Sequence, residues 1–267
     1  LLSPWIVNFA SNLYWVEFTW FLPMVIGLFC AWKVDNKYCR IFSYVAAFVA
    51  VTVKCLCGYE YITSVMMGLI LFLLSDFVMA CIKGDRKQQF LLFRTIFILG
   101  ILALAGFITA ICIHAPLRGN GSIAKGIKSI FIDDVLRRTT GADLNHYTED
   151  YVVALGASVW ETVCKYFHFN TQIITGIDGN LFPLLCIIPV LIFIIGLRRK
   201  SLHFEFVALY IVTFLTSVSW FVLAKSHSYV HTHINFVLWY MGYVQVCLYV
   251  IVDWIIDRIG VRREYYE

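Results

Sequence analysis

The stretch FLLFRTIFILGILALAGFITAICI, residues 90–113, decides the fold class of this chain. Arg94 is its only charged residue, and the run exceeds the roughly 20 apolar residues that a helix needs to cross a bilayer. Six other runs approach that length. They predict an all-α membrane protein of about seven transmembrane helices, at residues 18–32, 41–53, 62–82, 90–113, 181–197, 204–223 and 234–256.

The composition supports the same class. The chain has 267 residues, of which 61% are hydrophobic and 14% are charged, with a mean hydropathy of +0.79. A soluble domain carries about 25% charged residues, whereas a protein in lipid needs few because its solvent is apolar. The net charge of +4 is divided among short clusters between apolar runs. This placement is a topology signal rather than a nucleic-acid-binding surface, so no nucleic acid partner is expected.

The basic clusters follow the first, third, fifth and seventh apolar runs. One orientation therefore places all of them on the cytoplasmic side, and the outer side then holds residues 1–17, 54–61, 114–179 and 224–233. We expect a multi-pass protein of the plasma (inner) membrane with a cytoplasmic C-terminus. The clusters are Lys33, Lys37, Arg40; Lys83, Arg86, Lys87; Arg198, Arg199, Lys200; and Arg258, Arg262, Arg263.

The chain divides into three expected parts. Residues 1–113 hold four transmembrane helices, residues 114–179 form one large extracytoplasmic loop with short helices, and residues 180–267 hold three helices and the C-terminus. Within the loop, residues 158–169 are amphipathic, and Trp160, Tyr166 and Phe167 are expected to anchor them in the membrane interface. Because the chain begins at Leu1 rather than Met, we expect it to be the C-terminal part of a longer protein.

The opening SPWIVNFASNLYWVEFTWFLP places polar groups among aromatic residues at the outer boundary. Trp5, Tyr14, Trp15 and Trp20 suit a sugar-binding groove, because the C–H face of a sugar packs on aromatic rings. Glu17 is an acid at the same boundary. The alternative is an ordinary aromatic belt at the membrane surface.

The segment KCLCGYEY, residues 54–61, joins the second and third helices on the same side. Lys54 would suit a phosphate as a point charge, and Glu60 is the nearby acid. A solvated loop with a local ion pair explains the same residues. Cys55 and Cys57 form an isolated C-x-C pair, which is a weak metal signal and a poor disulfide.

The segment DDVLRR, residues 133–138, offers two chemistries. Asp133 and Asp134 could bind a divalent cation or act as a base, while Arg137 and Arg138 could clamp a phosphate. Salt bridges between residues four apart on a helix are the ordinary explanation.

Histidines collect in KSHSYVHTHINFVLWY, residues 225–240. Lys225, His227 and His231 could surround a phosphate. His227 and His231 have a spacing known from zinc sites, but an acidic partner is absent from the segment, so no metal ligand is assigned. Interfacial histidines that pack under aromatic rings remain the alternative.

Three of these segments, LSPWIVNFASNLYWVEFTWFLPM, KCLCGYEYIT and HSYVHTHINFVLWY, resemble the membrane part of bacterial GT-C-type glycosyltransferases. The resemblance lies in arrangement and covers most of the chain loosely. It implies transfer of a sugar from a polyprenyl-phosphate-linked donor to a cell-envelope glycan or lipid acceptor on the extracytoplasmic side. Such enzymes keep a catalytic acid in a first outer loop, which would precede Leu1. A divalent cation is a possible cofactor.

The resemblance gives each candidate residue a role. Lys54, Arg137, Arg138, Lys225, His227 and His231 would hold the lipid phosphate, and Glu17 and Glu60 are the remaining acids for catalysis. Fixed cations would stabilise the charge on the leaving phosphate, and a carboxylate would deprotonate the acceptor hydroxyl. Two alternatives remain open: a transporter or flippase-like protein for a lipid or small solute, and a membrane subunit without catalytic activity.

Overall fold

A computed structural model describes residues 4–10, 16–139, 149–173, 176–177 and 179–259, and every named element in these ranges is a helix. The elements are α1 (Pro4–Ala10), α2 (Phe18–Trp32), α3 (Lys37–Leu56), α4 (Ile62–Lys83), α5 (Arg86–Arg118), α6 (Ile123–Ser129), the π-helix η1 (Ile130–Leu136), α7 (Glu149–Gly156), α8 (Val159–Phe167), α9 (Phe182–Arg199), α10 (Phe204–Leu223), α11 (Lys225–Val230), α12 (Thr232–Asn235), the 3-10 helix η3 (Phe236–Tyr240) and α13 (Tyr243–Ile259). Thr171 and Asn180 form an isolated bridge.

Five helices are long and apolar enough to cross a membrane: α3, α4, α5, α9 and α10. The α12–η3 segment and α13 would make a sixth span if the two pieces are counted as one bent helix. The first apolar run is a shorter helix of 15 residues, α2. The chain is therefore an all-helical membrane protein, and the count of seven spans stays a prediction.

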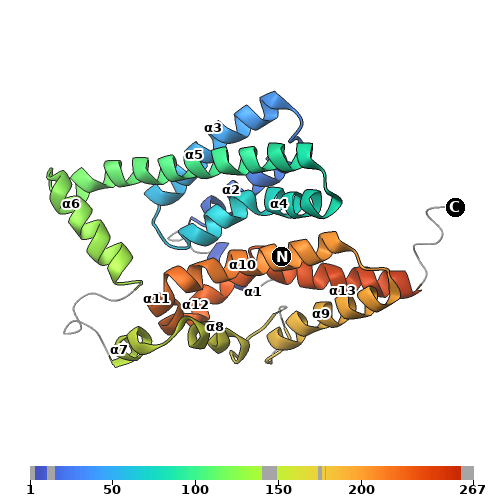
Figure 1. Cartoon of the computed structure of the whole chain (residues 1–267). Helices are drawn as coiled ribbons and strands as arrows, with labels where there is room; N and C mark the ends of the chain where they lie inside the picture. The colour runs from blue at the N-terminus through green and yellow to red at the C-terminus, as the bar shows by residue number, and fades with distance from the viewer. Residues whose placement is uncertain (1–3, 11–15, 140–148, 174–175, 178, 260–267) are drawn as a thin grey trace.

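The helices form a bundle in which α4 packs against α2, α5 and α10 (Figure 1). Helix α3 lies along α5, while α9 and α10 pack on α13. Gly27 lets α2 approach α4 closely, because a Cβ at this position would lie 1.8 Å from the Leu69 carbonyl oxygen. The face of α5 away from the bundle exposes a continuous apolar stripe, as expected of a surface that meets lipid: Phe93, Phe97, Ile101, Leu104 and Ile108.

The bundle has two different ends. What we call the loop end gathers the α3–α4 connection with the short helices α6, α7, α8 and α11, on the left of Figure 1. What we call the basic end holds the short connections α2–α3, α4–α5 and α9–α10 and the last residues of α13. Gly84 (φ +70°) ends α4 there, and the Asp85 side chain then caps α5 by accepting from the Gln88 backbone N–H.

The last apolar run is broken. Its two pieces, residues 232–240 and α13, meet at 50° next to Gly242, whose φ of +114° suits glycine. A break in a membrane helix frees carbonyl groups that lipid cannot satisfy. Here the Ser217 hydroxyl donates to the Leu238 carbonyl at 2.8 Å, and the Gln245 amide donates to the Tyr240 carbonyl at 2.7 Å. The break is therefore accommodated by neighbouring side chains.

The region expected to be a loop with short helices contains α6, η1, α7 and α8. Helix α5 continues to Arg118, so this region begins a few residues after the expected boundary. Helix α8 begins with a capping box between Ser158 and Glu161. One expectation for it was wrong: Tyr166 is fully buried and stacks on Phe221 with a centroid distance of 4.2 Å, whereas Trp160 is 75% exposed.

Candidate functional site

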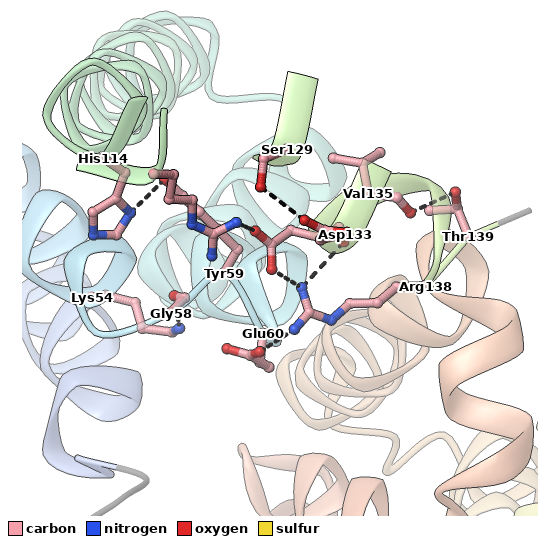
Figure 2. A network of polar contacts seen from close by, with 12 residues as sticks. Lys54, Gly58, Tyr59, Glu60, His114, Ser129, Asp133, Val135, Arg138 and Thr139 are labelled. Atoms are coloured by element: carbon pink, nitrogen blue, oxygen red, sulfur yellow. Dashed lines mark hydrogen bonds and ion pairs between the residues drawn. The ribbon is translucent and has the colours of Figure 1, made fainter. Parts of the chain in front are cut away.

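A cavity of about 420 Å³ opens at the loop end between α2, α3, the α3–α4 connection, α5 and the segment that follows α6 (Figure 2). Its walls are mostly polar and come from four parts of the sequence that are far apart. The side chains and backbone that line it belong to Trp20, Lys54, Leu56, Cys57, Gly58, Tyr59, Glu60, His114, Arg118, Asp134 and Arg138.

Lys54 is the most deeply placed cation of this cavity. Its residue is 1% exposed, and its ammonium Nζ donates to the Gly58 carbonyl at 2.6 Å. An ammonium has three protons to donate. No described acid lies within ion-pair distance of Lys54, so its ammonium keeps donor capacity for a ligand in the cavity that it lines.

The connection between α3 and α4 shapes one wall through two left-handed residues. Gly58 has φ +142°, and Tyr61 has φ +61°. A Cβ at Gly58 would lie 2.4 Å from the Glu60 carboxylate oxygen Oε2, so glycine is required both for the turn and for the position of Glu60. The turn thus presents the Gly58 carbonyl to Lys54 and the Glu60 carboxylate to the opposite wall.

Arg138 joins that wall to the region after α6. Its guanidinium pairs with Glu60, which is 78 residues away in the sequence, and with Asp134 at 2.7 Å. Arg118, at the end of α5, pairs with the other oxygen of Asp134. Figure 2 shows the Arg138 guanidinium pointing toward Glu60. The Nε of Arg138 is buried and has no hydrogen-bond partner among the described residues.

The DDVLRR segment is divided between two environments. Asp134 and Arg138 form the helical salt bridge that the spacing suggested, but Asp133 instead accepts from the Ser129 hydroxyl at 2.8 Å. Arg137 is exposed and makes no ion pair with a residue that the structure describes.

Tyr59 and His114 complete the cavity wall through a hydrogen bond of 2.9 Å between the phenol oxygen and Nδ1. Burial raises the pKa of Tyr59 to about 12, so the phenol stays protonated at neutral pH. Tyr59, His114 and Arg118 were not candidates from the sequence, whereas Trp20 was named there for sugar stacking and lines the cavity. Position in the sequence could have indicated two of these residues, because His114 and Arg118 follow the longest apolar run on the side that holds Lys54.

His227 lies behind this cavity rather than in its wall. Its backbone N–H donates to the Arg138 carbonyl at 3.4 Å, and its ring lies 4.8 Å from that of His231. The pKa of His227 is lowered to about 3, mainly because the ring is buried. His231 and the two arginines of the DDVLRR segment lower it further. Burial and His233 also lower the pKa of His231. Within the described residues, no three His, Cys, Asp or Glu side chains form a group that could hold a metal ion.

Several candidate residues lie away from the cavity. Lys225 donates to the Leu155 and Ala157 carbonyls at 2.9 and 2.5 Å, which ties α11 to the end of α7. Trp5 packs on Phe236 with a centroid distance of 5.4 Å. Tyr14 and Trp15 lie outside the described residues.

Glu17 precedes α2 and is absent from the cavity lining. Its Oε1 is buried with no hydrogen-bond partner among the described residues, and burial raises its pKa. Of the two acids proposed from the sequence, only Glu60 lines the cavity.

The chain matches no protein-family model, no curated protein and no solved structure.

Proposed function

We propose that this chain is the membrane part of a GT-C-type glycosyltransferase that uses a polyprenyl-phosphate-linked sugar donor at the loop end. The observation that carries the proposal is the buried Lys54 ammonium, which faces a polar cavity and uses one hydrogen bond within the chain. A buried charge is costly unless it is paired, so this site favours an anionic ligand. The five candidate spans and the apolar stripe of α5 support a ligand that is carried by a membrane lipid.

The charge balance of the cavity narrows the ligand. Arg118 and Arg138 are compensated by Asp134 and Glu60, which leaves Lys54 as the uncompensated cation of the lining. One net positive charge matches one phosphodiester group, which carries a single negative charge. A diphosphate would bring at least one more negative charge next to Glu60 and Asp134. The cavity therefore favours a donor linked through one phosphate.

The residues of the wall supply the other parts of a transfer reaction. Arg138 engages Oε1 of Glu60, and no described side chain bonds to Oε2. Oε2 can accept the proton of an acceptor hydroxyl while the hydroxyl oxygen attacks the sugar carbon. The bond from this carbon to the phosphate oxygen breaks, and Lys54 stabilises the charge that the leaving phosphate gains. Trp20 offers an aromatic ring to the sugar.

The acceptor would be a cell-envelope glycan or lipid, and the protein would lie in the plasma membrane with its basic end in the cytoplasm. The partners are then the membrane lipid, the sugar donor and the acceptor.

The proposal is tested with Lys54→Met in the full-length protein in nanodiscs. Sugar transfer from a labelled polyprenyl-phosphate donor and binding of that donor are measured, with the polyprenol as the probe that lacks phosphate. Loss of one charge-assisted contact of about 1.5–3 kcal/mol lowers donor affinity roughly tenfold to a hundredfold. Lys83→Met, at the exposed basic end, should bind and transfer as the wild type does. Equal donor affinity of Lys54→Met and wild type would overturn the proposal.

One observation favours a second candidate, a transporter or flippase-like protein. The break at Gly242 produces a discontinuous helix, and such helices line the substrate sites of many transporters. Donor-lipid movement across liposomes without sugar transfer would support this candidate. A protein that neither transfers nor moves the lipid would be a non-catalytic subunit.

A further inference from the structure

A chain of buried hydrogen bonds runs behind the cavity from His227 to the residue next to Glu60. The Asn235 amide Nδ2 donates to His227 Nδ1 at 3.2 Å, and the Tyr61 hydroxyl donates to Asn235 Oδ1 at 2.9 Å. An amide nitrogen can only donate, so His227 Nδ1 must accept. Tyr61 and Asn235 are fully buried.

Tyr61 holds the turn that carries Glu60. Its left-handed φ of +61° is a backbone conformation that bulky residues rarely adopt. The ring is fixed between Trp20 and Trp220, at centroid distances of 5.0 and 5.5 Å, and by the hydrogen bond to Asn235. Because Glu60 precedes Tyr61 directly, the contacts that hold the Tyr61 ring also fix the backbone from which the Glu60 carboxylate extends.

The same segment also holds the partner of Glu60. The His227 backbone N–H donates to the Arg138 carbonyl at 3.4 Å, and the neighbouring Ser226 hydroxyl donates to the Thr139 carbonyl at 2.9 Å. Residues 226–235 therefore contact both sides of the Glu60–Arg138 pair.

We propose that His227, Asn235 and Tyr61 are positioning residues of the cavity, which fix Glu60 against Arg138 only while the His227 ring is neutral. This rests on the proposed function in naming the cavity as the donor site. It replaces the direct phosphate-binding role that the sequence suggested for His227.

The groups around His227 determine the sign of the pH effect. His231 follows on the same segment, and Arg137 and Arg138 act on His227 from the end of η1. Tyr61 and Tyr166 of α8 both interact with the Asn235 side chain. The two arginines oppose a positive charge on the His227 ring, and a protonated Nδ1 cannot accept a hydrogen bond from Asn235. The ordinary histidine pKa is about 6.5. Because the pKa of His227 is lowered when the turn is closed, the closed turn is fully stable above about pH 6.5 and loses stability as the pH falls from there.

The two roles of His227 predict opposite responses to acid. A histidine that contacts the phosphate gains charge at low pH and binds the anion more tightly. A positioning histidine opens the turn and weakens the site. A phosphodiester probe separates the two cleanly, because its own charge stays constant over this range.

Hydrogen exchange of the full-length protein in nanodiscs, without ligand, tests the proposal. Protection of amides 57–61, corrected for intrinsic exchange rates, should fall about fivefold between pH 6.5 and pH 5.5. His227→Asn keeps an acceptor in the place of Nδ1 but cannot be protonated, so its protection should stay constant. His203→Asn, at the exposed basic end, should behave as the wild type does.

Constant protection in the wild type, or the same fall in His227→Asn, would overturn the positioning role. The direct role would be restored if the affinity of the wild type for a polyprenyl phosphodiester rises in acid and that of His227→Asn does not. His227→Leu provides a second arm, since it should bind the probe more weakly than His227→Asn at pH 7.5. Failure of the wild type to bind the probe, with the pH effect on exchange intact, would count against the proposed function alone.

Discussion

The two ends of the bundle contain the same cationic residue types in different surroundings. At the basic end, Lys33, Lys83, Arg86, Arg199 and Arg258 are exposed on short connections and helix termini. At the loop end, Lys54 is buried, and the Arg138 side chain is 12% exposed and paired with two acids. Exposed cations act through their number and side of the membrane, whereas buried cations act through individual contacts. In the proposed topology, the first kind would set the orientation in the membrane, and the second kind would build the donor site.

The clearest way to break this comparison is to show that both ends face the same compartment. Cys57 and Cys81 are free and exposed, next to α3 at the loop end and in the last turn of α4 at the basic end. An impermeant maleimide applied to one side of sealed vesicles should label one of the two and spare the other. Peptide mass spectrometry identifies the labelled site. Equal labelling of both from one side would remove the topology on which the proposed function rests.

Arg138→Met measures how strongly the loop end depends on single contacts. It leaves Glu60 partly buried without its ion-pair partner and Asp134 with Arg118 alone, and we expect a loss of about 3 kcal/mol in the free energy of unfolding. Arg199→Met at the basic end should change it by less than about 0.5 kcal/mol. Denaturant unfolding in detergent gives both values, and similar losses for the two variants would contradict the contrast.

A glycine pair sharpens the comparison further. Gly58 (φ +142°) and Gly84 (φ +70°) both have positive φ values, so alanine is strained at either position, by about 1 kcal/mol at Gly84 and by more at Gly58. A Cβ at Gly58 would also collide with Glu60, whereas one at Gly84 meets no atom within 4 Å. We expect Gly58→Ala to cost about 1 kcal/mol more than Gly84→Ala and to weaken donor binding, which Gly84→Ala should not. Equal effects on stability and binding would mean that Glu60 does not depend on this turn.

The sequence predicted the apolar helices well because hydropathy and length are local properties. The expected helices at 18–32 and 204–223 coincide with α2 and α10, and the expected start at residue 62 with that of α4. The sequence predicted one continuous helix over residues 234–256. The residues around Gly242 did not indicate that it would take a positive φ and break the helix.

The site was harder to predict because its contacts join distant segments. Lys54, Glu60 and Arg138 were chosen by residue type and side of the membrane, and they line one cavity. The pairing of Arg138 with Glu60 and the contact of Tyr59 with His114 arise only when α3, α5 and η1 pack together. Burial of Tyr166 and the diversion of Lys225 to backbone carbonyls follow equally from tertiary packing. The roles of Lys54, Glu60 and Arg138 in sugar transfer stay predictions.

The unequal lengths of α2 and α5 have a consequence for the lipid around the protein. The 15 residues of α2 rise about 22 Å and the 33 residues of α5 about 50 Å, against a hydrocarbon layer of roughly 30 Å. Hydrophobic mismatch of opposite sign on two helices of one bundle is relieved by tilting the long one and thinning the bilayer beside the short one. Because Trp20 lies in the first turn of α2, such thinning lowers the head-group layer toward the cavity mouth. A lipid-borne phosphate then reaches Lys54 with less of its chain withdrawn from the membrane.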